Sequence, residues 1–140
     1  MTADKEHIDL FGAELIASKE VDGVLFQLYS NRIFYVRIPR YETVGPKIIQ
    51  LGYDFLDEHG GGKFHNIYHM QSFSDVDQNT RDWASDPEGN KYTLTDAIVI
   101  ENVGQKIITD FYLKFDKPVV ATKVFFSLKK SIEWTLRQMK

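Results

Sequence analysis

The chain has no cysteine among its 140 residues, which excludes disulfides and zinc–thiolate sites and fits a reducing cytoplasm, where we expect it to work. No run approaches the roughly 20 apolar residues of a membrane-spanning helix, and the charged first residues lack the apolar core of a signal peptide. Lysine and arginine form no tract and the net charge is −3, which argues against nucleic acid as the main partner.

What is present is enough for one folded domain. Hydrophobic residues make up 43% of the chain and aromatic residues 14%, and a chain of this length buries roughly two-thirds of its unfolded surface. We expect residues 1–12 to be a loose N-terminal segment, because they are polar, and residues 13–140 to form a single domain.

The N-terminal half begins as a meander of strands and continues into a helix. Asp22-Gly23 and Ser30-Asn31-Arg32 are turn signals that separate strand-like runs at 14–21, 24–29 and 33–38. Thr43 is the expected cap of the following helix, whose first turn accommodates Pro46. The helix has an apolar stripe and ends at a glycine run; these residues are Ile48, Leu51, Gly52, Phe55, Leu56 and Gly60–Gly62.

The rest of the chain alternates strands and helices. Residues 64–70 predict a strand, Asp77 the N-cap of a short helix through Ala84, and residues 87–90 a loop. An apolar run at 95–100 precedes a helix over 102–115, for which Asn102 and Gln105 have the spacing of a capping box. A strand at 122–126 then leads to a last helix opened by Ser127. This order predicts an α/β fold with a mixed sheet, opened by a hairpin meander, with about four flanking helices.

Several segments resemble the SpoIIAA-like, or STAS/SEC14-like, family of small bacterial domains. Residues 29–38 look like the family's opening hairpin, and Thr80-Arg81-Asp82-Trp83 is similar to its Ala-Arg-x-aromatic segment. Residues 110–118 resemble its Asn-Phe-Phe-Leu-Lys-Phe-Asn-Lys-Pro run, and Thr122–Phe125 with Ile132-Glu133-Trp134 resembles its closing strand and helix. The resemblance covers about residues 24–138 and implies a βαβ-rich mixed sheet flanked by helices.

The resemblance also implies a regulatory protein that works by contact with other proteins. Better-known STAS proteins are switched by phosphorylation of a serine in an Asp-x-Ser-Gly motif, which this chain lacks. The corresponding segment is Gln71–Asp77, in which Ser72 and Ser74 stand beside Asp75 and Asp77. A phosphate there would meet repulsion from two carboxylates, so we read these serines as turn and capping residues.

Other polar clusters carry no catalytic pattern. His65 and His69 are about 13 Å apart at strand rise, too far to share a metal ion, and His59 lies at a helix end. Asp54 and Glu58 share a helix face but are expected to be solvated. The chain has no nucleophile elbow, phosphate-binding loop or dinucleotide fingerprint, so we expect no enzyme, cofactor or metal site.

The predicted function is therefore a non-enzymatic interaction or regulatory domain, which binds another protein or a second copy of itself. We expect Ile107, Ile108, Phe111 and Phe115 to form a core stripe, with Leu113 off that face and Tyr112 at its edge. The predicted contact surface comprises Ser72, Ser74, Asp75, Asp77, Arg81, Tyr112 and Leu113. The alternative is a small-ligand or lipid-binding module of SEC14-like type, in which the aromatic residues Phe55, Phe64, Tyr68, Phe111 and Phe115 line a cavity.

Overall fold

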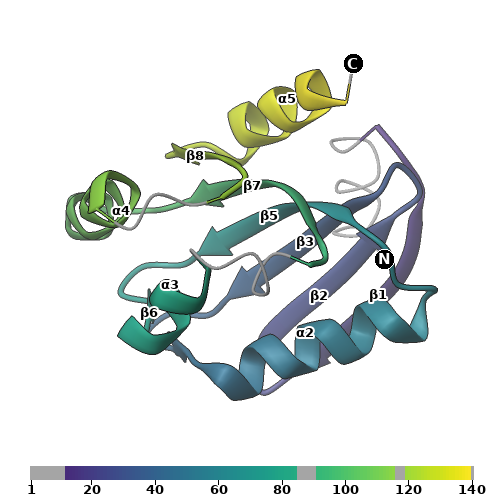
Figure 1. Ribbon diagram of the computed structural model, residues 1–140, viewed down its shortest axis with the longest axis horizontal. Coiled ribbons are helices and arrows are strands. Elements are labelled where there is room, and N and C mark those ends of the chain that lie inside the picture. Colours follow the sequence, from purple (N-terminus) through teal and green to yellow (C-terminus); the bar gives the residue numbers. More distant parts are fainter. Residues whose placement is uncertain (1–11, 85–90, 116–118, 140) are drawn as a thin grey trace.

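The protein is an α/β structure built on one six-stranded mixed sheet (Figure 1). The computed structural model describes residues 12–84, 91–115 and 119–139. In spatial order the strands are β1 (Leu15–Val21), β2 (Val24–Tyr29), β3 (Ile33–Ile38), β5 (Phe64–Met70), β7 (Thr93–Val99) and β8 (Ala121–Phe125). Strands β4 (Thr43–Val44) and β6 (Asp75–Val76) form a separate parallel pair. The helices are α2 (Pro46–Glu58), α3 (Gln78–Ala84), α4 (Val103–Phe115) and α5 (Leu128–Gln138).

The antiparallel half of the sheet is the predicted meander. Val21 pairs with Val24 across the first turn, where Asp22 and Gly23 have φ angles of 52° and 83°. Two consecutive positive φ values define the hairpin turn whose twist matches that of the flanking strands, and the Asp-Gly signal predicts it. From β3 onward the sheet is parallel, with β3, β5, β7 and β8 side by side and helical segments in the connections.

Helices α2 and α5 cover opposite faces of this sheet (Figure 1). On the α2 face, the rings of Phe26, Phe34 and Phe55 lie with centroids 5.9 to 6.1 Å apart. Gly52 lets the helix come close, since a Cβ there would stand only 3.4 Å from the Phe26 ring. On the other face, Ile132 of α5 packs in a second core with residues of β2, β3, β5 and β7, among them Tyr35, Ile67 and Val99.

Helix α2 begins later than the sequence predicts. Its N-cap is Gly45, which makes no side-chain capping bond, and Pro46 occupies the first turn as expected. Thr43 does not cap the helix, because it pairs with Asp75 in the short sheet of β4 and β6. That pairing ties the start of α2 to the segment before α3, where the Asp77 carboxylate accepts a hydrogen bond from the Thr80 backbone N–H at 2.8 Å. The prediction of Asp77 as the cap of α3 is thereby confirmed.

Helix α4 starts as predicted but does not bury the predicted stripe. The Gln105 N–H donates to Asn102 Oδ1 at 2.9 Å and the Asn102 N–H to Gln105 Oε1 at 3.2 Å, which completes the capping box. Ile107 and Ile108 are 66% and 46% exposed, so the prediction that they belong to the core is wrong. The side chains of Phe111 and Phe115 lie outside the described residues.

The placement of α4 explains this exposure. Figure 1 shows the helix beyond the carboxyl ends of the parallel strands, where the arrowheads of β5 and β7 point, instead of flat on a sheet face. Helix periodicity identifies an apolar stripe but does not say what covers it. Of the helices in the described ranges, none combines the length and apolar character needed to cross a membrane.

Candidate ligand-binding cavity

A row of polar side chains crosses the α2 face of the parallel strands. Phe34 of β3 pairs with Asn66 of β5, Asn66 pairs with Asp96 of β7, and Asp96 pairs with Thr122 of β8. Because residues in register across a sheet share a face, Asn66 and Asp96 stand side by side behind the phenylalanine core. The next row toward the carboxyl ends is apolar or aromatic and consists of Val36, Tyr68, Ile98 and Val124.

The side-chain amide of Asn66 uses its Nδ2 donor in hydrogen bonds but leaves its Oδ1 acceptor without a partner among the described residues. The residue is 3% exposed. Its Nδ2 donates to Thr93 Oγ1 at 3.0 Å and to Asp96 Oδ1 at 3.1 Å, which uses both amide hydrogens. Its Oδ1 is buried without a hydrogen-bond partner among the described residues. A buried polar atom left without a partner costs about 1–3 kcal/mol, so this oxygen is a position where a bound group would be stabilised.

Asp96 is a half-buried carboxylate, and the described part of the chain supplies no compensating cation. Among the ion pairs formed by the described residues, none includes Asp96. Burial raises the pKa of its carboxyl to about 6, and the hydrogen bond from Asn66 opposes that rise only in part. The site therefore places an uncompensated acid next to an unsatisfied amide oxygen.

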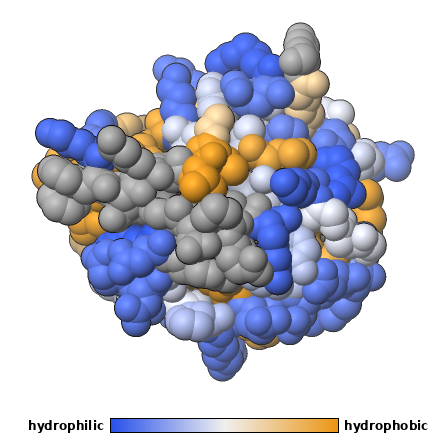
Figure 2. All heavy atoms as spheres, viewed as in Figure 1, coloured by the Kyte–Doolittle hydropathy of each residue, from blue (hydrophilic) through white to orange (hydrophobic). Residues whose placement is uncertain are grey.

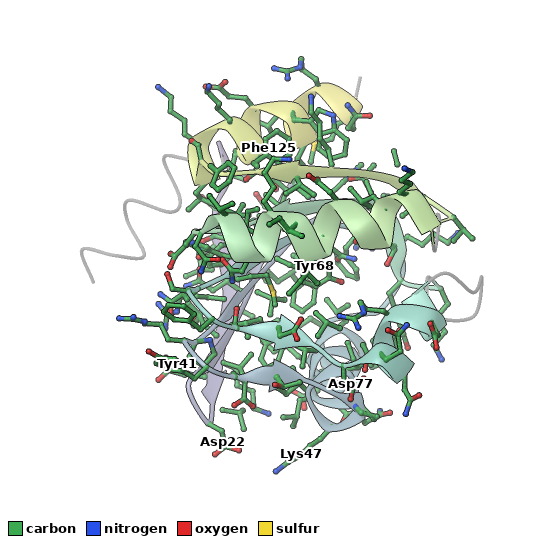
Figure 3. All side chains as sticks on the ribbon, turned by 90° about the vertical axis from the view of Figure 1, so that its left-hand side faces the viewer. Asp22, Tyr41, Lys47, Tyr68, Asp77 and Phe125 are labelled. Atoms are coloured by element: carbon green, nitrogen blue, oxygen red, sulfur yellow. The ribbon has the colours of Figure 1, made fainter. Side chains whose placement is uncertain are left out.

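Both groups border a cavity of about 200 Å³. Helix α2, the beginning of α4 and the sheet surround it, and its walls are mainly apolar, with Val36, Ile48, Ile98 and Ile108 among the lining residues. Figure 3, viewed from the left of Figure 1, shows Tyr68 between α4 and the short strands β4 and β6, in line with its place among the lining residues. The cavity thus combines mainly apolar walls with a few polar groups, among them Asn66 and Asp96 on the sheet, which form its floor, and this is the usual composition of a small-molecule site.

Three residues of the predicted contact surface lie at this cavity. Ser74, Asp75 and Arg81 all line it. The Ser74 hydroxyl is buried and donates to the Gln71 carbonyl at 2.6 Å. Arg81 lies 3.6 Å from Asp75 and donates to the Val76 carbonyl at 3.0 Å. Asp77 caps α3, as described above, and these residues together hold β6 and α3 beside the cavity.

Ser72 points to a different group of residues. Its backbone N–H and its hydroxyl donate to Glu101 Oε1 at 2.8 and 2.9 Å. Glu101 Oε2 lies 3.4 Å from His69 Nε2, and the Nδ1 of that histidine is 2.9 Å from the Tyr35 hydroxyl. Burial acts to raise the pKa of Glu101, but the hydrogen bonds from Ser72 and the neighbouring His69 together lower it, and the net shift is downward. This chain of contacts holds the carboxyl ends of β5 and β7 together.

The remaining predicted residues do not join the cavity. Leu113 is half-buried on α4, and the side chain of Tyr112 lies outside the described residues. His65 contacts Thr95 at 2.8 Å, so it has a different partner from His69. Within the described ranges no three histidine, aspartate or glutamate side chains gather in a way that could hold a metal ion. Asp54, Asp57 and Glu58 are exposed, as their position on α2 predicts.

The sequence carries a signal for Asn66 and Asp96 that is absent from the functional residues expected above. Each is a polar residue inside a run that predicts a strand, and Asp96 interrupts the apolar run at 95–100. Strands in the middle of a parallel sheet are buried on both faces and are normally continuous apolar runs. A carboxylate in such a strand is therefore a candidate functional residue, because aspartate is almost never fully buried without a partner.

Comparison with known proteins gives a family but no characterised relative. A family model matches residues 21–140. The chain belongs to the family described as a domain of unknown function, DUF7793. The match to DUF7793 runs from the end of β1 through α5, so it includes every strand and helix that borders the cavity. Neither the curated proteins nor the solved structures contain a match to the chain.

Proposed function

We propose that this DUF7793 domain is a non-enzymatic binding module that holds one small, mainly apolar molecule in the cavity between α2, α4 and the sheet. The observation that carries the proposal is the unsatisfied Asn66 Oδ1 on the floor of an apolar cavity. A polar atom in that position is a cost to the empty protein and a recognition point for a ligand. The expected setting is the cytoplasm, which suits a chain without cysteine.

The cavity volume limits the size of the ligand. A cavity of about 150 Å³ in an engineered protein binds benzene, whereas drug-sized sites start at about 300 Å³. At about 200 Å³, the cavity suits a molecule built on a single ring and is too small for a complete lipid chain. The proposal therefore keeps the small-ligand alternative drawn from the SEC14-like resemblance and narrows it to ring-sized molecules.

Two neighbouring isoleucines of α4 provide a matched test. Ile108 lines the cavity, whereas Ile107 is more exposed and is not among the lining residues. Native mass spectrometry of the purified wild type should detect a small-molecule adduct that is lost on denaturation. Ile108→Trp should fill the cavity and abolish the adduct, and Ile107→Trp should retain it. A wild type without adduct, or equal adducts in the two variants, would contradict the proposal.

Contact with a second copy of the chain is the other candidate function. Val103 and Ile107 lie one turn apart on α4 and are 68% and 66% exposed, and Phe126 beyond the edge strand β8 is 55% exposed. Figure 2 shows the face of the molecule that is seen in Figure 1. This face is mainly hydrophilic, with hydrophobic residues at the surface in a band beneath α5 and around α4. This arrangement favours the regulatory interaction domain that the SpoIIAA-like resemblance implies, with α4 as the contact surface.

A further inference from the structure

We propose that the cavity selects a ligand carrying a primary ammonium group on a ring-sized apolar body, and that Asn66 Oδ1 and the Asp96 carboxylate receive this group. The inference rests on the proposed function, and it adds the chemical class of the ligand. Its basis is the arrangement of hydrogen-bond donors, acceptors and charges around the polar floor.

The floor presents acceptors to a ligand. Both hydrogens of the Asn66 amide are used, by Thr93 and by Asp96. The opposite orientation of this amide would place its oxygen against the Asp96 carboxylate oxygen, and two acceptors cannot satisfy one another. Asn66 therefore offers only its oxygen, and the adjacent carboxylate accepts hydrogen bonds as well. A ligand that satisfies both must bring at least two donors.

The charges around the cavity select a cation. Its charged lining residues are Asp75, Arg81 and Asp96. Arg81 lies near Asp75 and also donates to Val76 and to Gln78 Oε1, so it is held at the α3 side. Asp96 is thus the one negative charge that these lining groups leave uncompensated.

An ammonium group meets both requirements. It is a compact positive charge with three N–H donors, as in the lysine side chain, and its hydrogen bonds to a carboxylate are about twice as strong as those between neutral groups. An alcohol would supply one donor and no charge. A carboxylate ligand would be repelled by Asp96 and would leave the Asn66 oxygen unsatisfied.

Three probes of nearly equal shape separate these possibilities. Isothermal titration at pH 7.5 would compare 2-phenylethylamine, 2-phenylethanol and phenylacetate, which differ mainly in charge and in hydrogen-bond donors. The amine should bind about tenfold to a hundredfold more tightly than the alcohol, the range expected for a hydrogen bond between charged groups, and phenylacetate should bind most weakly.

Variants of Asp96 test whether this residue causes the preference for the amine. Asp96→Asn keeps the shape of the side chain and removes its charge, so it should bring the affinity for the amine within about threefold of that for the alcohol. Asp54→Asn is the matched control, because it removes an exposed carboxylate of α2 that is not among the lining residues, and it should leave the preference unchanged. Lowering the pH from 7.5 to 5 should also weaken binding of the amine, since protonation of Asp96 removes its charge.

The outcomes distinguish the two proposals. Equal binding of the three probes, or an amine preference that survives Asp96→Asn, would overturn the ammonium inference and leave the cavity as a binding site. Failure of all three probes to bind would overturn the proposed function as well. If Asp96→Asn does not fold, the ranking of the probes on the wild-type protein decides the matter.

Discussion

Asp96 illustrates, at the scale of a single residue, how a group in the proposed binding site can reduce the stability of the fold. Its carboxyl is desolvated by burial, accepts one hydrogen bond from Asn66 and pairs with no cation of the described residues. Desolvation penalises the charged form of a carboxyl group, which is why the pKa rises. Binding sites commonly retain such groups because function, and not stability, selects them.

The stability of the protein should therefore depend on the protonation of Asp96. The folded carboxyl titrates near pH 6 and the unfolded one near pH 3.8, so between these values the folded state holds more protons. Stability should then fall as pH rises through this window. Asp96→Asn should remove that loss and raise the free energy of unfolding by about 1–3 kcal/mol at pH 7.5.

Urea denaturation at pH 4 and pH 7.5 would measure this effect. The wild type and the control Asp54→Asn should share the pH dependence contributed by Asp96, and Asp96→Asn should lack that component. If Asp96→Asn is less stable than the wild type at pH 7.5, the Asp96 carboxylate stabilises the fold, which would contradict this prediction.

Ser72 and Ser74 are also informative at the residue scale. The Ser74 hydroxyl is buried, and the Ser72 hydroxyl donates to the carboxylate of Glu101. A phosphate on either would add about −1.5 to −2 charges beside acidic groups. We predict that neither serine is phosphorylated in cells. Mass spectrometry of protein isolated from its native cells would check this, and a phosphoserine at either position would restore the phosphoswitch hypothesis.

At the scale of the element, the start of α4 depends on one capping box. Asn102→Ala should cost about 0.5–2 kcal/mol, the usual loss for a helix N-cap. Gln105→Ala should cost more, because this buried side chain also accepts from the Glu101 N–H at 2.8 Å and donates to the Gln71 carbonyl at 2.8 Å. Chemical denaturation would rank the two variants, and an equal or smaller loss for Gln105→Ala would contradict the structure.

The exposed side of α4 should contribute to association and not to folding. Ile107→Lys should change the free energy of unfolding by less than about 0.5 kcal/mol, as for other exposed positions. Phe55→Ala, which empties a core site on α2, should cost about 3–5 kcal/mol. Light scattering during gel filtration should show a wild-type dimer that Ile107→Lys dissociates. A monomeric wild type would remove the second candidate function.

Local signals in the sequence predict where helices and turns begin, but they do not predict how these elements pack against one another. The Asp22-Gly23 turn, the cap at Asp77 and the Asn102–Gln105 box depend on neighbouring residues, and each is present. The prediction of Thr43 as the helix cap was wrong because Thr43 pairs with Asp75, 32 residues further along the chain. The exposure of Ile107 and the pairing of Asn66 with Asp96 likewise depend on contacts between distant segments, which periodicity within one helix or strand cannot specify.

At the scale of the whole molecule, the two faces of the sheet differ. The α5 face is a filled core, where the rings of Phe125 and Trp134 lie 5.8 Å apart and Ile132 is fully buried. The α2 face is filled over β2 and β3 by the phenylalanine rings and borders the cavity over β5 and β7. The mixed sheet thus has a packed core on one side and, on the other, the cavity that we propose as the binding site.

The most direct test of this account is a methyl NMR titration with 2-phenylethanol, a neutral probe that examines the cavity independently of charge. We expect saturable shifts of the methyl groups of Ile48, Ile98 and Ile108, which line the cavity. The exposed residues Ile16 and Ile107 should remain unshifted. No saturable shift at the three lining isoleucines, or larger shifts at Ile16 and Ile107, would contradict the claim that this domain binds a small molecule between α2, α4 and the sheet.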